Sequence, residues 1–274
     1  MLILTIIGYI ILGFIVGGFG TLVGAGGGFL LMPVLLLLFP GMPSDMVTAI
    51  SMTTVFFNST SGSIAYARIK RIDYKTGFIL ASATLPGVII GTFVTSMTSR
   101  SLFDMIFGGS MFVFAVVILL KSRVGNHSSA IDKQGAFRAR RLFINRDGTE
   151  IAFSFNLLIG VLVSVVVGFL SGFLGIGGGI VHVPALIFLG FPAHFATATS
   201  HFVLAWSSLT SFLVHLANST LSHNNLMAFC IAGGAVAGAQ IGARLSKKVK
   251  GSVIMIFLSA ALILAGTRIF ISGL

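Results

Sequence analysis

Hydrophobic residues along the chain fall into ten runs, separated by short polar stretches and one longer basic stretch. The runs cover residues 2–23, 27–39, 46–67, 77–97, 102–120, 151–174, 177–190, 193–217, 226–243 and 252–272. Most approach the roughly 20 apolar residues that a helix needs to cross a membrane. Strands of a membrane barrel would instead alternate apolar and polar residues over about ten positions. The pattern therefore predicts an all-α, polytopic integral membrane protein.

Composition and charge agree with this fold class. The chain is 56% hydrophobic and 8% charged, with a mean hydropathy of +1.07, whereas a soluble domain has roughly 25% charged residues. Most of its 17 lysines and arginines lie in loop 68–75 and linker 121–150. This bias is typical of cytoplasmic loops, so we expect a lipid bilayer and no nucleic acid as partner. The sequence leaves the oligomeric state open.

The two halves of the chain are tandem copies. We divide them into a first transmembrane repeat, a basic linker and a second transmembrane repeat, at residues 1–120, 121–150 and 151–274. An offset of 151 matches Gly24 to Gly175 and Pro33 to Pro184. Farther along, an offset of 149 matches the Ala-x-Ser segments that begin at positions 49 and 198. The halves therefore share one architecture, with compensating length changes in loops.

Loop charges predict that the two repeats have inverted topology. Loop 68–75 is basic, whereas its counterpart 218–225 has no lysine or arginine; loop 244–250 is basic, whereas its counterpart 98–104 has no net charge. Corresponding loops should therefore face opposite sides of the membrane. This places both termini outside and linker 121–150 in the cytoplasm.

Within the linker, one short segment combines basic and apolar residues. It runs from Phe137 to Ile144 and contains three arginines. We expect it to be a basic amphipathic piece that lies on anionic lipid.

A glycine-rich break occurs at the same place in each half, at Gly24–Pro33 and Gly175–Pro184. Each glycine costs about 1 kcal/mol in a helix interior, so three together predict a broken helix. The following segment, 27–39, would be about 20 Å long as a helix, too short to span alone. It should begin partway into the membrane, with a re-entrant hairpin as the alternative. No Gly-Lys-Ser/Thr follows, so a nucleotide loop is excluded.

These breaks are the first candidate binding elements. Helix N-termini present unpaired N–H groups and a positive dipole end to anions. We expect them at Gly26, Gly27 and Gly28 in the first half and at Gly177, Gly178 and Gly179 in the second. The alternative is that the glycines only let helices pack closely.

The third segment of each half adds a polar stripe, spaced to lie along one helix face. It consists of Thr48, Ser51, Asn58 and Ser61 in the first half and Thr197, Ser200, Ser207 and Thr210 in the second. Ser51, Asn58, Ser200 and Ser207 are candidate substrate ligands, and Ser59 is a further candidate. Trp206, the only tryptophan, is another because it falls inside a segment. The alternatives are hydroxyl bonds to the local helix backbone and, for Trp206, ordinary packing.

The histidines inside predicted segments, His182, His194, His201 and His215, all lie in the second half. His201 is a candidate ligand, and His182 and His201 are candidates for proton coupling; a hydrogen-bonded core position is the alternative. All six acidic residues lie in loops or at segment ends, whereas cation-coupled pumps usually keep a carboxylate inside the membrane. We expect an anion site, with no metal and no cofactor.

These motifs resemble those of the TauE/SafE sulfite exporter family. The paired Gly-x-Gly-Gly-Gly-x-x-x-x-Pro elements, each followed by an Ala-x-Ser helix, carry the resemblance, which covers nearly the whole chain outside the linker. The resemblance implies transport of small sulfur-containing anions, such as sulfite, sulfoacetate or other organosulfonates, across the bacterial inner membrane.

The predicted function is therefore a secondary transporter or exporter of a small sulfur oxyanion that works by alternating access. A passive anion channel would use the same donors and is the first alternative. A membrane-embedded enzyme is the second alternative, but it would need a positioned nucleophile, base or metal. We therefore do not expect an enzyme. The sequence does not specify the anion, the direction of transport or the coupling ion.

Overall fold

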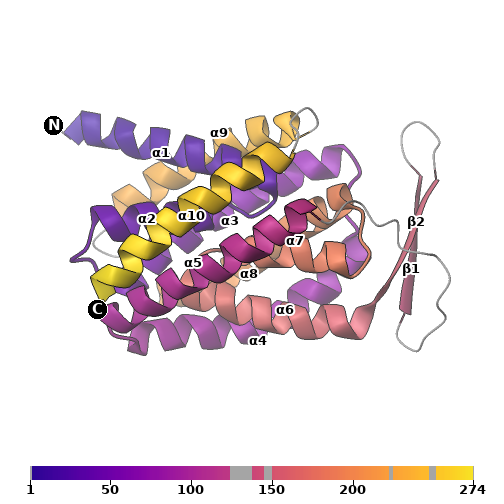
Figure 1. The fold of residues 1–274 in the computed structure, drawn as a ribbon. Helices are drawn as coiled ribbons and strands as arrows, with labels where there is room; N and C mark the ends of the chain where they lie inside the picture. The colour runs from indigo at the N-terminus through magenta and orange to yellow at the C-terminus, as the bar shows by residue number, and fades with distance from the viewer. Residues whose placement is uncertain (1, 124–137, 145–149, 222–224, 247–250, 274) are drawn as a thin grey trace.

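The computed structural model describes residues 2–123, 138–144, 150–221, 225–246 and 251–273. Its helices are α1 (Leu2–Val23), α2 (Gly28–Leu38), α3 (Ser44–Arg68), α4 (Tyr74–Met97), α5 (Arg100–Arg123), α6 (Leu157–Leu174), α7 (Gly179–Phe188), α8 (Ala193–Ala217), α9 (Asn225–Leu245) and α10 (Gly251–Gly273). Two strands, β1 (Arg138–Ile144) and β2 (Glu150–Asn156), form an antiparallel hairpin between the halves. The described chain is thus a bundle of long helices with one hairpin at an end (Figure 1).

One element differs from the hydrophobic pattern. The run 151–174 predicted a helix from its first residue, which is wrong, because residues 150–156 form a strand and the helix begins at Leu157. The segment 137–144, expected as an amphipathic piece on lipid, is largely the partner strand. Other linker residues, 124–137 and 145–149, lie outside the described residues. The placement of the linker on lipid stays a prediction.

Helix partners are exchanged between the two halves. The first helix of each half packs on the fourth helix of the other half, so α1 lies on α9 and α6 lies on α4. A methyl group on Gly13 of α1 would lie 1.9 Å from the carbonyl oxygen of Ile231, and one on Gly17 would lie 2.5 Å from Ala235. The contact positions advance together, so α1 and α9 run parallel.

The second exchanged pair has the same geometry. A methyl group on Gly87 of α4 would lie 2.3 Å from the carbonyl oxygen of Val165, and one on Gly91 would lie equally close to that of Phe169. Helices α4 and α6 therefore also run parallel. Side chains cannot fit at these crossings, so the glycines permit backbone-to-backbone packing.

Helices α3 and α8 form the centre of the bundle. They pack on each other, and each also packs on the fourth helix of the other repeat, α3 on α9 and α8 on α4. Many polar side chains of α3 and α8 are buried. The last helices, α5 and α10, pack on each other at the periphery and run antiparallel, since Ser101 near the start of α5 donates to the carbonyl of Gly273.

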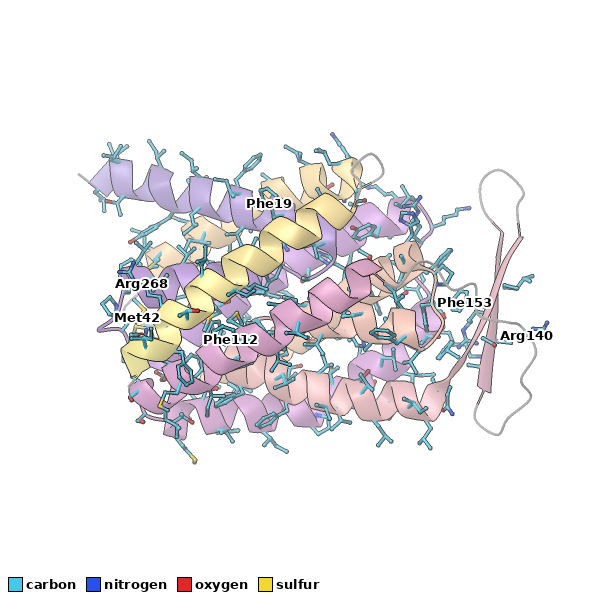
Figure 2. The ribbon with its side chains drawn as sticks, in the orientation of Figure 1. Phe19, Met42, Phe112, Arg140, Phe153 and Arg268 are labelled. Carbon is cyan, nitrogen blue, oxygen red and sulfur yellow. The ribbon has the colours of Figure 1, made fainter. Side chains whose placement is uncertain are left out.

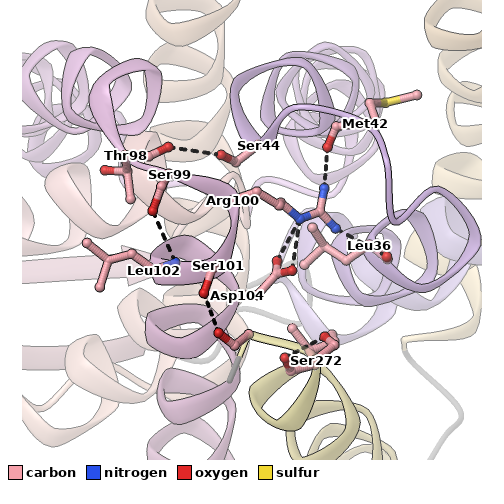
Figure 3. A network of polar contacts seen from close by, with 12 residues as sticks. Leu36, Met42, Ser44, Thr98, Ser99, Arg100, Ser101, Leu102, Asp104 and Ser272 are labelled. Carbon is pink, nitrogen blue, oxygen red and sulfur yellow. Dashed lines mark hydrogen bonds and ion pairs between the residues drawn. The ribbon is translucent and has the colours of Figure 1, made fainter.

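Each glycine break lies inside the bundle, and the helix that follows it turns back. Helix α2 returns toward the end at which α1 begins (Figure 1). At that end Arg100 donates to the carbonyl of Leu36 (3.2 Å) and to that of Met42, and its Nε is 2.9 Å from Asp104 (Figure 3). Arg100 thus satisfies one carbonyl group in the last turn of α2 and one in the loop that follows it. The α1–α2 pair therefore enters the bundle and leaves it at the same end.

A cavity of about 370 Å³ opens at this end. It is lined by Pro40, Gly41, Met42, Pro43, Ser44, Asp45, Thr95, Ser96, Thr98 and Arg100. The lining comes from the loop between α2 and α3 and from the turn between α4 and α5. None of these lining residues belongs to either glycine break.

The hairpin occupies the opposite end of the bundle. Phe153 and Phe155 pack against Phe191, with ring centroids 4.8 and 4.6 Å apart. Phe153 points toward the helices and Arg140 points away from them (Figure 2). Phe153 and Phe155 are two residues apart and both buried, as expected for side chains on one face of a strand.

Helix length and composition allow α1, α4, α6, α8 and α9 each to cross a membrane. Their outward faces carry exposed apolar side chains, such as Phe19 at 49% and Ile90 at 56% exposure (Figure 2). A soluble protein would not leave such continuous apolar faces in water. The chain is an all-α, multi-pass membrane protein, apart from the hairpin.

Two neighbouring glycines of α9 provide a matched test of the helix exchange. A methyl group on Gly234 would lie 2.0 Å from the carbonyl oxygen of Ile10, whereas one on Gly233 meets nothing within 4 Å. We expect Gly234→Ala to lower the free energy of unfolding by about 1–3 kcal/mol through overpacking. Gly233→Ala should be neutral or stabilising by up to about 1 kcal/mol. Thermal unfolding in detergent measures both, and equal midpoints would contradict the packing of α1 on α9.

Candidate functional site

The two glycine breaks cross each other through their backbones. A methyl group on Gly28 would lie 2.8 Å from the carbonyl oxygen of Ile176, and one on Gly179 would lie 2.6 Å from the Cα of Ala25. The crossing is fully enclosed, because Ala25 and Ile176 are both 0% exposed. The sequence predicted both breaks, and the structure brings them into direct contact.

Left-handed backbone makes each break abrupt. Gly26 and Gly27 have φ values of 76° and 82°, and Gly177 and Gly178 have values of 78° and 74°. Only glycine adopts this conformation without steric cost. Gly27 and Gly178 are the N-cap residues of α2 and α7. Each short helix therefore starts inside the bundle.

The first turn of each short helix begins at the crossing, at Gly28 in α2 and at Gly179 in α7. In α2 the carbonyl oxygen of Gly27 already accepts from the N–H groups of Leu30 and Leu31, both at 3.0 Å. The N–H groups before them have no partner within the helix. Two such N-termini, from α2 and α7, meet at the centre and make it a region of positive potential.

Two apolar side chains fill the space between the breaks. Val55 of α3 and Leu204 of α8 are 0% and 1% exposed. A methyl group on Gly26 would lie 2.6 Å from Leu204 Cδ2, and one on Gly177 would lie 2.7 Å from Val55 Cγ1. Both residues stand about halfway along helices of 25 residues. The crossing therefore lies about halfway between the two ends of the helix bundle.

A group of polar side chains from three helices lies beside the first break. Thr21 Oγ1 donates to Asn58 Oδ1 at 3.2 Å and lies 3.4 Å from His201 Nε2. The Tyr66 hydroxyl donates to the carbonyl of Thr21 at 2.8 Å, and the rings of Tyr66 and His201 meet edge to face. This group joins α1, α3 and α8 beside the break.

Donors next to the first break lack partners. A methyl group on Gly26 would lie 3.2 Å from Ser59 Oγ. Within the part of the chain that the structure describes, Ser59 Oγ and Asn58 Nδ2 are buried and make no hydrogen bond. Unpaired buried donors are costly, so these two groups mark a place where a polar ligand would be favoured.

Other predicted residues differ in their partners. Ser51 Oγ donates to the carbonyl of Gly175 at 2.6 Å, so it ties α3 to the second break. Its counterpart Ser200 is buried, and its hydroxyl has no partner among the described residues. Ser207 donates to the carbonyl of Leu204 within its own helix, the alternative that the sequence left open for such hydroxyls.

Two predicted residues lie apart from this group. Trp206 is 42% exposed and packs against Phe78 and Phe202 on the outside of the bundle. His182 of α7 is buried, and its Nε2 lies 3.2 Å from Ser164 Oγ of α6. The structure thus gathers Asn58, His201 and the glycines, and it places Trp206 on the surface.

Sequence reasoning missed four residues of the site: Thr21, Val55, Tyr66 and Leu204. Thr21 lies inside an apolar run, and Tyr66 lies at the end of another. Val55 and Leu204 match each other under the offset of 149. The repeat alignment therefore held the signal for the apolar pair, although its position between the breaks required the structure.

Comparison with known proteins gives a consistent result. The sequence profile of the family described as Sulfite exporter TauE/SafE matches residues 9–269. A Bacillus subtilis protein named "Probable membrane transporter protein YunE" is 31% identical over 272 residues, 97% of each chain. A Methanocaldococcus jannaschii protein, also named a probable membrane transporter, is 30% identical over 216 residues, 77% of this chain and 72% of its own.

A plant protein also matches a shorter stretch. The Arabidopsis thaliana protein named "Sulfite exporter TauE/SafE family protein 6" is 33% identical over 72 residues, 26% of this chain and 17% of its own. No solved structure matches.

The equivalent serines Ser51 and Ser200 test the contact between α3 and the second break. Ser51→Ala removes the donor to the buried carbonyl of Gly175, so we expect the free energy of unfolding to fall by about 1–3 kcal/mol. Ser200→Ala removes a hydroxyl without a partner among the described residues and should not lower stability. Thermal unfolding without ligand compares them; equal losses would contradict the assignment of the contact.

Proposed function

We propose that this chain, which belongs to the sulfite exporter TauE/SafE family, is a secondary transporter that moves small sulfur oxyanions by alternating access. The family and the named relatives identify it as a membrane transporter. Sulfite, sulfoacetate and other organosulfonates are the proposed substrates. The observation that carries the proposal is the meeting of two helix N-termini beside unpaired donors at mid-depth.

The chemistry of the crossing favours an anion. Backbone N–H groups of Gly27, Gly28 and Phe29, and of Gly178, Gly179 and Ile180, are the proposed main donors. Asn58 Nδ2, Ser59 Oγ and Ser200 Oγ, which have no partner among the described residues, would donate to substrate oxygens. Neutral donors bind an anion without trapping it, which suits repeated turnover.

Acidic groups are kept away from the proposed site. The ion pairs Arg100–Asp104 and Arg141–Asp73 lie at opposite ends of the bundle. A carboxylate at the centre would repel a bound anion. The distribution of charge therefore favours an anion over a cation as the transported species.

Helix directions support inverted topology for the repeats. Helix α3 runs parallel to α9, because Ser61 contacts Val236 and Gln240 while Phe57 contacts Phe229. Helix α8 runs parallel to α4, because Gly77 lies beside Phe202 and Thr92 bonds Ser211.

The central helices link these parallel pairs. Gly62 of α3 lies beside His201 of α8, and Val55 and Leu204 both lie beside Gly26, so α3 and α8 run antiparallel. Helix α1 is parallel to α9 and therefore to α3, and helix α6 is parallel to α4 and therefore to α8. The first helices of the two repeats, α1 and α6, therefore run in opposite directions. Rocking of two such inverted units about a central site is the usual basis of alternating access.

Basic residues favour one orientation in the membrane. The loop 69–73 between α3 and α4, the hairpin and the end of α9 lie at the same end of the bundle (Figure 1). Their basic residues favour a cytoplasmic location for this end. We propose that both termini lie on the outer side of a bacterial inner membrane.

Proton coupling is assigned to His201. Its Nε2 lies beside Thr21 Oγ1 in the group that surrounds the first break, so a proton gained there would add a donor for the anion. His182, the other proposed coupling residue, contacts Ser164 in the second half. Replacement of His201 or His182 by glutamine, which cannot gain a proton, tests this role. Loss of uptake driven by a proton gradient, with anion binding retained, would indicate loss of coupling and not of binding.

Ligand stabilisation tests the class of substrate. We expect sulfite or an alkanesulfonate to raise the thermal unfolding midpoint of the purified protein, because a ligand that binds only the folded state stabilises it by RT ln(1 + [L]/Kd). Sodium, potassium and magnesium chlorides at equal ionic strength are the controls. Stabilisation by a cation alone would overturn the anion site. In proteoliposomes, uptake that saturates and exceeds equilibration under an imposed gradient would distinguish a transporter from a channel.

The glycine breaks themselves are tested by valine. Gly27 and Gly178 have positive φ, which a β-branched residue does not adopt. We expect Gly27→Val and Gly178→Val to reduce uptake at least tenfold, because the N-terminal N–H groups would be displaced. Gly109→Val, at a helical glycine with nothing within 4 Å of an added methyl group, is the control. Normal uptake by the first two variants, at equal amounts in the membrane, would reduce the glycines to packing elements.

A further inference from the structure

Two apolar side chains, Val55 and Leu204, lie against the glycines of the proposed site. Val55 reaches three site glycines: its Cγ1 lies 3.2 and 2.7 Å from methyl groups placed on Gly26 and Gly177, and its Cγ2 lies 2.7 Å from one placed on Gly28. Leu204 reaches two of the three, Gly26 and Gly177. These side chains therefore occupy the space between the two helix N-termini.

The two apolar residues are related by the internal repeat. Val55 and Leu204 stand at equivalent positions of the two repeats, under the same offset of 149 that relates Ser51 to Ser200. Each is followed four residues later by a serine, Ser59 or Ser208. Ser59 faces the first break without a partner among the described residues, whereas Ser208 donates to the carbonyl of Leu204. Of these two equivalent hydroxyls, only the one beside the first break is therefore left to donate to a ligand.

An anion at this crossing would meet donors on one side and alkyl groups on another. Sulfite and sulfonates carry three oxygens on one side of sulfur, and the fourth direction holds a lone pair or a carbon. Sulfate carries oxygen in all four directions. An oxygen pressed against alkyl groups loses its water without gaining a hydrogen bond, which disfavours binding.

We propose that Val55 and Leu204 form an apolar wall of the anion site, which selects anions with three oxygens on one side of sulfur and rejects anions with oxygen in all four directions, such as sulfate. The inference rests on the proposed function and extends it to two specificity-determining residues. The wall receives the apolar substituent of a sulfonate, so the volumes of these two side chains set the largest substituent that fits.

Competition in proteoliposomes tests the wall. The probe is uptake of radiolabelled methanesulfonate, and the readout is the ratio of inhibition constants for sulfate and unlabelled methanesulfonate. We expect at least a tenfold preference for methanesulfonate in the unaltered protein. Val55→Thr keeps the shape of the side chain but adds a hydroxyl donor, so it should reduce this preference at least fivefold. Val47→Thr, at another buried position of α3, should leave the preference unchanged.

A second variant tests the size of the sulfonate substituent that the wall admits, and it can be read even if the first variant does not fold. Leu204→Ala enlarges the apolar space, so the inhibition constant for butanesulfonate relative to methanesulfonate should fall at least fivefold. Val203→Ala, at the neighbouring buried position of α8, is the control and should not change that ratio.

The outcomes distinguish failure of the proposed wall from failure of the proposed transport function. Saturable methanesulfonate uptake with no discrimination against sulfate, or with ratios unaltered in Val55→Thr and Leu204→Ala, would overturn the wall and leave the proposed function intact. Failure of the unaltered protein to bind or transport either anion would overturn the proposed function itself, and the wall with it.

Discussion

Direct contact between the two glycine breaks is the constraint on which the structure depends. Gly28 meets the backbone of Ile176, and Gly179 meets that of Ala25, at distances that leave no room for a side chain. Backbone N–H groups cannot be left unpaired against lipid, so the breaks require a protein enclosure. The exchanged helices, α1 on α9 and α6 on α4, provide it. Mid-helix glycines at those crossings, which weaken isolated helices, are therefore necessary for the breaks to exist.

Backbone symmetry and side-chain asymmetry serve different purposes. The breaks, the central helices and the apolar pair Val55 and Leu204 occur in both halves, so either half can present a helix N-terminus to the centre. The polar group of Thr21, Asn58 and His201 occurs only beside the first break. Under the offsets that relate the repeats, glycine, serine and methionine stand at the equivalent positions. A bound anion would therefore have a preferred orientation between two units of similar backbone.

Hydrophobic pattern and repeats predicted the membrane class, the helix bounds and both breaks, because each of these depends on local composition. The hairpin was missed because the short segment 151–156, Ile-Ala-Phe-Ser-Phe-Asn, reads equally as a strand or as the start of a helix. Contacts of Phe153 with Phe191 and Phe195, which lie much farther along the chain, accompany the strand that forms. Trp206 was misplaced within the bundle because segment membership does not specify which helix face is buried. The site assembles from α1, α3 and α8, and contacts between distant segments were not encoded in any single motif.

The two ends of the bundle are closed to different degrees, and the hairpin accounts for the difference. Arg141 of β1 pairs with buried Asp73 at 2.9 Å, and the N–H of Asp73 donates to Thr199 Oγ1 at 3.1 Å. Phe153 of β2 packs on the loop before α8. The hairpin thus binds the α3–α4 loop of one half and the start of α8 in the other. Separation of these segments at this end must break the ion pair or carry the hairpin along. At the opposite end, where the cavity beside Arg100 opens, the halves are joined by the hydrogen bond from Ser101 to the carbonyl of Gly273, whereas the Arg100–Asp104 ion pair lies within the first half. We therefore expect a rocking motion to open the cavity end more easily than the hairpin end.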